Sequence, residues 1–149
     1  MGRKIVGVLG GLIVGFAWNM ALVILSSYLF PPPAGVDLND AEAFAAYVET
    51  LPMTAFLIVL VAHAGGAFVG GYICEMIVGQ NWLAGPICIG TLTLLGGVTN
   101  LMMISHPVWF AIADLILYLP AAIFGAIVAG KSHPSQPVTS EPESIATDE

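Results

Sequence analysis

Four long apolar runs with almost no charged side chains constrain this chain more than any other feature. They cover about residues 5–30, 53–74, 82–103 and 108–129. Between Pro52 and Lys131 the only charged side chains are Glu75 and Asp114. An α-helix needs about 20 predominantly apolar residues to cross the hydrocarbon core of a bilayer. The sequence therefore predicts an all-α, polytopic integral membrane protein, a four-transmembrane-helix bundle formed by residues 1–130.

The composition agrees with a membrane protein and excludes one large class of partner. Hydrophobic residues make up 58% of the chain and charged residues 9%, whereas soluble domains carry about 25% charged residues. The three Lys and Arg residues are too few for a nucleic-acid-binding surface. We therefore expect the lipid bilayer, and no nucleic acid, among the partners of this chain.

The basic residues predict how the chain is oriented in the membrane. Arg3, Lys4 and Lys131 lie near the two ends of the chain, and cytoplasmic segments of membrane proteins are enriched in Lys and Arg. Both termini are therefore predicted to be cytoplasmic, in a multi-pass protein of the cell (inner) membrane. The loop 31–52 would then lie outside, and the loop that contains Glu75 would lie inside.

Two segments are predicted to lie outside the membrane core. Asn39 is the predicted N-cap of a short amphipathic helix at about residues 40–50, with Glu42 three residues later as in a capping box. Such a helix would rest on the outer face of the membrane. Residues 131–149 are rich in Pro, Ser, Thr and acidic residues, which predicts a disordered acidic cytoplasmic tail.

Glycines and other small residues recur at helical spacing within the apolar runs. Helices in lipid associate where small residues let two backbones approach closely. The sequence therefore predicts that the helix-packing positions include Gly7, Gly11, Gly15, Gly66, Gly70, Gly96 and Gly125.

Each run also places polar side chains on the face that carries its small residues. Polar groups within membrane spans usually face the interior of the bundle. The predicted intramembrane polar cluster consists of Asn19, His63, Asn100, Asp114 and Tyr118. If the second and fourth spans are neighbours, Asp114, Tyr118 and His63 form a hydrogen-bonded chain that Asn19 extends. A wet cavity and a dry hydrogen-bonded core would both satisfy this pattern.

Two stretches resemble a family of small uncharacterised four-span bacterial membrane proteins. They are LPMTAFLIVLVAHAGGAFVGG and NLMMISHPVWFAIADLILYLPAAIFGAIVAG. The resemblance covers roughly residues 1–130, implies the four-span architecture and brings no known activity. The first span lacks the membrane-embedded Glu of small multidrug transporters.

The sequence shows no catalytic constellation. It has no nucleophile elbow, no HExxH motif and no phosphate-binding glycine loop followed by Lys. We therefore expect no enzyme, no cofactor and no metal site. Cys74 and Cys88 do not form a CxxC motif and are predicted to be reduced, buried thiols.

Three functions remain open at this point. The first is a structural or accessory module that packs with other membrane proteins or with its own copies in a homo-oligomer. The second is a small oligomeric transporter or channel. The third is a proton- or pH-responsive element built on His63 and Asp114. They are distinguished by whether the polar faces line one cavity or bury against each other.

Overall fold

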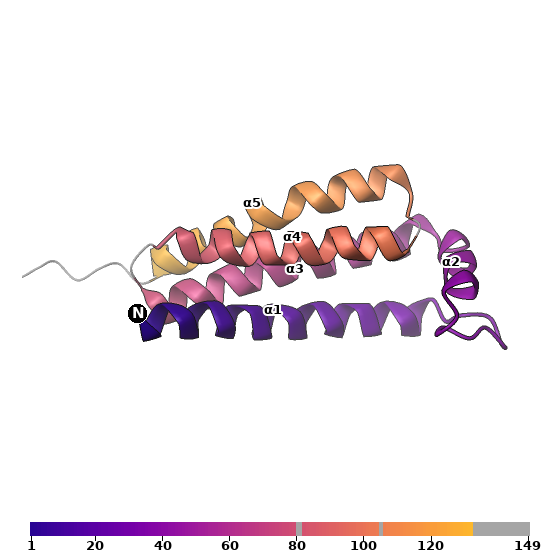
Figure 1. Cartoon of the computed structure of the whole chain (residues 1–149), viewed down its shortest axis with the longest axis horizontal. Helices are drawn as coiled ribbons and strands as arrows, with labels where there is room; N and C mark the ends of the chain where they lie inside the picture. The colour runs from indigo at the N-terminus through magenta and orange to yellow at the C-terminus, as the bar shows by residue number, and fades with distance from the viewer. Residues whose placement is uncertain (80–81, 105, 133–149) are drawn as a thin grey trace, which may run out of the picture.

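The computed structural model describes residues 1–79, 82–104 and 106–132, and these residues form five helices and no strand. Four helices are long and apolar enough to cross a membrane: α1 (Gly2–Leu29), α3 (Met53–Val78), α4 (Ala84–Met103) and α5 (Val108–Ser132). The short helix α2 (Ala41–Glu49) lies between α1 and α3 along the chain (Figure 1). The all-α fold with four spans is confirmed. The prediction of a disordered tail falls almost entirely on residues 133–149, outside the described residues.

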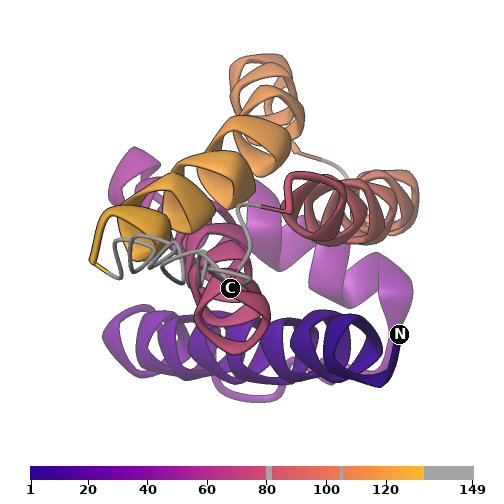
Figure 2. The same cartoon turned by 90° about the vertical axis from the view of Figure 1, so that its left-hand side faces the viewer.

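Helix α3 is the centre of the bundle. It packs against α1, α4 and α5, whereas α1 packs mainly on α3 and touches α4 only briefly. The end-on view in Figure 2 shows α3 between α1 on one side and the pair α4 and α5 on the other. The second and fourth spans, α3 and α5, are therefore neighbours. The start of α1 and the end of α5 lie at one end of the bundle, called the terminal end below, and α2 lies at the other (Figure 1).

Proline and glycine residues determine where α1 and α3 end. Helix α1 ends just before three consecutive prolines, which cannot continue its hydrogen-bond ladder. Helix α3 ends at Gly79, which has a φ of 64° and donates its N–H to Glu75 O at 2.7 Å. This left-handed cap lies five residues beyond the predicted end of the span. Glu75 is therefore buried inside α3, and its predicted place in a loop is wrong.

The cap of α2 lies one residue later than predicted. Asp40, rather than Asn39, accepts hydrogen bonds from the N–H groups of Glu42 at 2.9 Å and Ala43 at 3.3 Å. Asn39 instead donates its backbone N–H and side-chain amide to Asp37 Oδ1, at 2.9 and 3.0 Å. The carboxylate of Asp37 thus holds Asn39 in the preceding turn, which leaves Asp40 to cap the helix.

Helix α2 covers one end of the bundle. Val48 is buried against Phe56 of α3 and Phe110 of α5. The Tyr47 hydroxyl donates a hydrogen bond to Phe30 O, which joins α2 to the segment that follows α1. Burial raises the pKa of Tyr47 above its usual value, so the hydroxyl stays a proton donor at neutral pH. The predicted amphipathic helix is therefore anchored by its apolar face to α3 and α5, and by the Tyr47 hydroxyl to the segment that follows α1.

Glycines allow the spans to approach closely. A Cβ on Gly11 or Gly15 would collide with a backbone carbonyl of α3, and a Cβ on Gly125 would collide with Phe68 O. The packing contact predicted at Gly96 belongs instead to Gly97, where a Cβ would lie 2.6 Å from the Tyr118 hydroxyl. Gly96 is exposed, and a Cβ there would meet nothing within 4 Å. Close contacts with another helix occur at the other predicted positions, Gly7, Gly11, Gly15, Gly66, Gly70 and Gly125.

Candidate functional site

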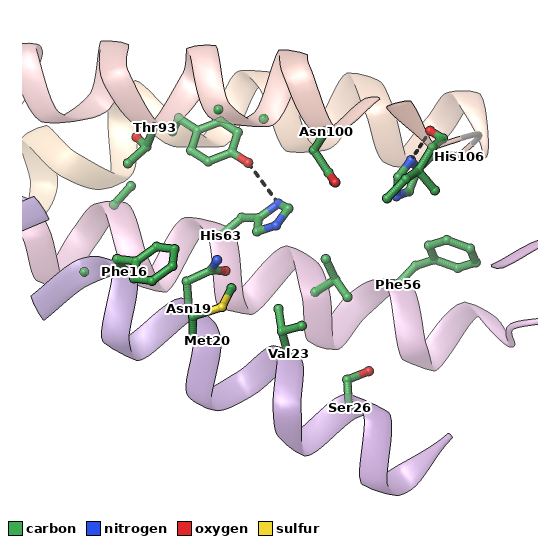
Figure 3. Close-up of a pocket in the computed structure, with 18 of the residues that line it drawn as sticks. Phe16, Asn19, Met20, Val23, Ser26, Phe56, His63, Thr93, Asn100 and His106 are labelled. Atoms are coloured by element: carbon green, nitrogen blue, oxygen red, sulfur yellow. Dashed lines mark hydrogen bonds between the residues drawn. The ribbon is translucent and has the colours of Figure 1, made fainter. Parts of the chain in front are cut away.

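A pocket of about 710 Å³ lies between α1, α3 and α4, with α2 over one end. This volume is within the range of about 300–1,000 Å³ typical of small-molecule sites. Its walls are mainly apolar, as in Figure 3, where Phe16, Met20 and Val23 of α1 face it. Polar side chains also line it: Asn19, Ser26, Ser27, Tyr47, His63, Thr93, Asn100, His106 and Tyr118.

His63, Asp114 and Tyr118 form a closed triangle of hydrogen bonds between α3 and α5. The His63 Nδ1 atom lies 2.7 Å from Asp114 Oδ1 and 2.9 Å from the Tyr118 hydroxyl. The Tyr118 hydroxyl donates to Asp114 Oδ2 at 3.1 Å. Asp114 is 1% exposed, so its carboxyl group depends on these two partners. The structure thus brings together three of the five predicted cluster residues.

The two asparagines of the predicted cluster stand apart from this triangle. Asn19 does not extend the hydrogen-bonded chain, because its buried Oδ1 has no partner in the described part of the protein. The Asn100 side chain likewise makes no hydrogen bond to any described residue. Figure 3 shows Asn19 on α1, His63 on α3 and Asn100 on α4 around the same space. Three helices therefore each supply a polar side chain to one cavity.

His63 and Tyr118 both belong to the buried triangle and line the pocket, and His63 has a ring nitrogen that the triangle does not use. Its Nδ1 faces Asp114 and Tyr118, and the residue lines the pocket. Its Nε2 makes no hydrogen bond within the residues that the structure describes. The imidazole can therefore offer Nε2 to a ligand while α5 fixes the orientation of the ring. Nowhere in the described chain do three metal-ligating side chains gather closely enough to hold an ion.

The terminal end of the bundle is closed by dry packing. Ile89 of α4 is fully buried and lies close to Gly11 and Gly70 at the floor of the pocket. Beyond it, Cys74 and Val78 belong to a compact apolar cluster. Cys74 is buried as predicted, but Cys88 is exposed on α4, so the prediction for that thiol is wrong. The pocket therefore lies between this closed terminal end and α2.

The basic side chains that the structure describes lie away from the pocket walls. Arg3 donates to Ile77 O, and Lys4 lies 4.8 Å from the centre of the Trp82 ring, both at the terminal end. No Lys, Arg, Asp or Glu is among the described residues that line the pocket. The pocket surface is therefore polar in places but carries no permanent charge.

Five of the polar residues that line the pocket lie outside the predicted cluster: Ser26, Ser27, Tyr47, Thr93 and His106. Ser26 is buried and lines the pocket from α1. It follows Asn19 by seven residues, which is two helical turns, so helical periodicity could have identified it. His106 lies in the short connection between α4 and α5, where no helical periodicity indicates its direction.

Comparison of this chain with known protein families, characterised proteins and solved structures finds no match.

Proposed function

We propose that this chain is an integral membrane protein that binds a small lipid-soluble molecule within the bilayer. The observation that carries this proposal is the pocket of about 710 Å³ into which Asn19, His63 and Asn100 face. A bundle selected only for packing would pair these groups with each other, because an unsatisfied polar group in hydrocarbon costs several kcal/mol. The geometry therefore supports a ligand-handling role over a purely structural one.

The side of the pocket supports an entry route from the lipid. Phe16 of α1 and Leu92 of α4 line the pocket, yet they are 64% and 45% exposed on the surface of the bundle. Gly96, which follows Leu92 by one helical turn on α4, is exposed as well. These residues mark an opening between α1 and α4, while α2 covers the end. A lipid-soluble molecule would enter sideways from the membrane.

The floor at Ile89 favours a binding component over an open channel. Passage across the membrane would require α4 to move away from α1 and α3, because Ile89 of α4 lies close to Gly11 of α1 and Gly70 of α3. The sequence-based proposals of a small oligomeric transporter and of an accessory module are both compatible with such a component. In a transporter the ligand would be the transported molecule. In an accessory module the ligand would be presented to a membrane-protein partner or to further copies of the chain.

Filling the pocket is expected to abolish binding without disturbing the fold. Gly96 is exposed and lines the pocket, and a Cβ there meets no neighbour within 4 Å, so we expect an aromatic ring in Gly96→Phe to have room to block the side opening. The probe is the total lipid of the expressing membrane, measured as lipid retained per purified chain by native mass spectrometry. We expect Gly96→Phe to lose roughly 90% of a stoichiometric lipid adduct, a tenfold change.

The matched control for this experiment is Leu95→Phe. Leu95 is the adjacent residue on α4, is exposed and does not line the pocket. It should retain the adduct of the parent protein. Equal retention by Gly96→Phe and the parent would reject the proposal.

We also propose that both termini are cytoplasmic and that the protein belongs to the inner membrane. The support is the position of Arg3, Lys4 and Lys131 at the terminal end. In intact cells, a membrane-impermeant maleimide should label Glu49→Cys and leave Ser140→Cys unlabelled. Labelling of Ser140→Cys with Glu49→Cys protected would reverse the orientation.

A further inference from the structure

The wall chemistry of the pocket indicates a ligand with an uncharged head. Charged side chains are missing from the described lining, and Asp114 lies directly behind His63. A phosphate or carboxylate head would find no Lys or Arg there and would face a nearby carboxyl group. Burying an unpaired ion in an apolar medium is strongly unfavourable. The pocket therefore selects against anionic lipids.

The polar groups of the pocket require a head that both donates and accepts hydrogen bonds. Asn19 Oδ1 is a buried acceptor with no partner among the described residues. His63 Nε2 has no partner among the described residues, and an imidazole nitrogen donates or accepts a hydrogen bond according to its tautomer. Asn19 Oδ1 needs a donor. A hydroxyl group meets both requirements, and a head with two hydroxyls can meet them at once.

The remaining walls fit a hydrocarbon chain. Phe16, Met20 and Val23 form an apolar strip along α1 next to Asn19 (Figure 3). This strip reaches the side opening at Phe16 and Leu92, where the protein surface meets lipid. The hydrocarbon chain of a lipid whose polar headgroup lies near Asn19 can therefore leave the pocket between α1 and α4. None of its apolar groups would then face water.

We propose that the ligand is a neutral lipid with a hydroxyl-bearing head, of the monoacylglycerol class, held by Asn19, His63 and Asn100. This inference rests on the proposed function and specifies the ligand of the same pocket. Asn19 and Asn100 act as specificity-determining residues for the head, and the apolar strip along α1 holds the chain.

The test uses the purified full chain and four probes that share one oleoyl chain. They are monooleoylglycerol, methyl oleate, oleate and oleoyl lysophosphatidate, and their dissociation constants are measured by native mass spectrometry. A net hydrogen bond contributes about 0.5–1.5 kcal/mol, which corresponds to about a tenfold change in affinity at its upper end. We expect monooleoylglycerol to bind roughly tenfold more tightly than each of the other probes.

The variant that tests the head contact is Asn19→Leu. It replaces the amide by an apolar group of similar size and should weaken monooleoylglycerol binding roughly tenfold, with methyl oleate unchanged. Asn100→Leu makes the same comparison on α4 if Asn19→Leu does not fold. Tightest binding of oleate or lysophosphatidate, or an unchanged preference in the folded variant, would overturn the inference.

Gly96→Phe separates failure of this inference from failure of the proposed function. If Gly96→Phe prevents binding of all four probes but the parent protein binds the four with equal affinity, the pocket binds lipid without recognising the hydroxyl-bearing headgroup. If Gly96→Phe binds the probes like the parent, they do not occupy this pocket, and both proposals are wrong.

Discussion

Gly71→Leu is expected to destabilise the bundle more than any other single change proposed for it. A Cβ at Gly71 would collide with the backbone carbonyl of Ala122 on α5. A backbone cannot rotate away as a side chain can, so α3 and α5 must separate. Overpacking usually costs about 1–3 kcal/mol and more where the backbone has to move. The measurement is the midpoint of thermal unfolding in detergent, which should fall well below that of the parent protein.

Two further substitutions provide a comparison for the unfolding midpoint of Gly71→Leu. Gly70→Leu should also lower the midpoint, because a Cβ there lies 3.0 Å from Ile89 Cγ2 and 3.1 Å from Gly11 O. Gly96→Leu should unfold near the parent midpoint, because its Cβ meets no neighbour. If Gly71→Leu unfolded at the same temperature as Gly96→Leu, the close approach of α3 and α5 would be wrong.

The second large effect is expected at the buried hydrogen-bond triangle. His63→Leu removes the partner of Asp114 Oδ1 and leaves a carboxyl group that is 1% exposed with Tyr118 alone. An unsatisfied buried polar group costs about 1–3 kcal/mol, and a charged one costs more. The free energy of unfolding should fall by about that amount.

A double variant tests whether His63→Leu loses stability because the carboxyl group of Asp114 is left without its partner. Adding Asp114→Leu to His63→Leu removes that group, and replacement of a buried pair by apolar residues is often neutral or stabilising. The double variant should therefore be more stable than His63→Leu. A double variant that is less stable than His63→Leu would show that Asp114 stabilises the fold independently of His63.

Asp114→Asn addresses the proton-responsive role separately. The amide keeps the shape of the side chain and can still bond Tyr118 and His63, so the fold should persist. If Asp114 and His63 share a proton, the pH dependence of the histidine chemical shifts should change in this variant. An unaltered pH response in a stable Asp114→Asn variant would remove the proton role and leave a structural triangle.

The spans and the hydrogen-bonded triangle could be predicted from the sequence because both depend on local patterns. Mean hydropathy over about 20 residues decides whether a helix crosses a membrane. Asp114 and Tyr118 are four residues apart, which places them on one helical face. The rest of the triangle required only that α3 and α5 be neighbours, as they are.

The errors concern adjacent residues or contacts made across the whole bundle. Gly96 and Gly97 differ by about 100° of helical rotation, and only the position of α5 decides which of them packs. Asn39 and Asp40 are both good caps, and the carboxylate of Asp37 decided between them. The sequence left a cavity and a dry core as alternatives, because the pocket depends on the distance between α1 and α4, which no local sequence pattern determines.

The unequal lengths of α1 and α4 make the pocket sensitive to the thickness of the surrounding membrane. Helix α1 has 28 residues and α4 has 20, which at the helical rise gives about 42 and 30 Å. Helix α4 matches a hydrocarbon core of about 30 Å, whereas the longer α1 must tilt to fit. Because Gly11 and Gly15 pack closely on α3, we expect this tilt to move the part of α1 near α2 away from α4. Shorter lipid chains would increase the tilt and widen the side opening, and longer chains would narrow it.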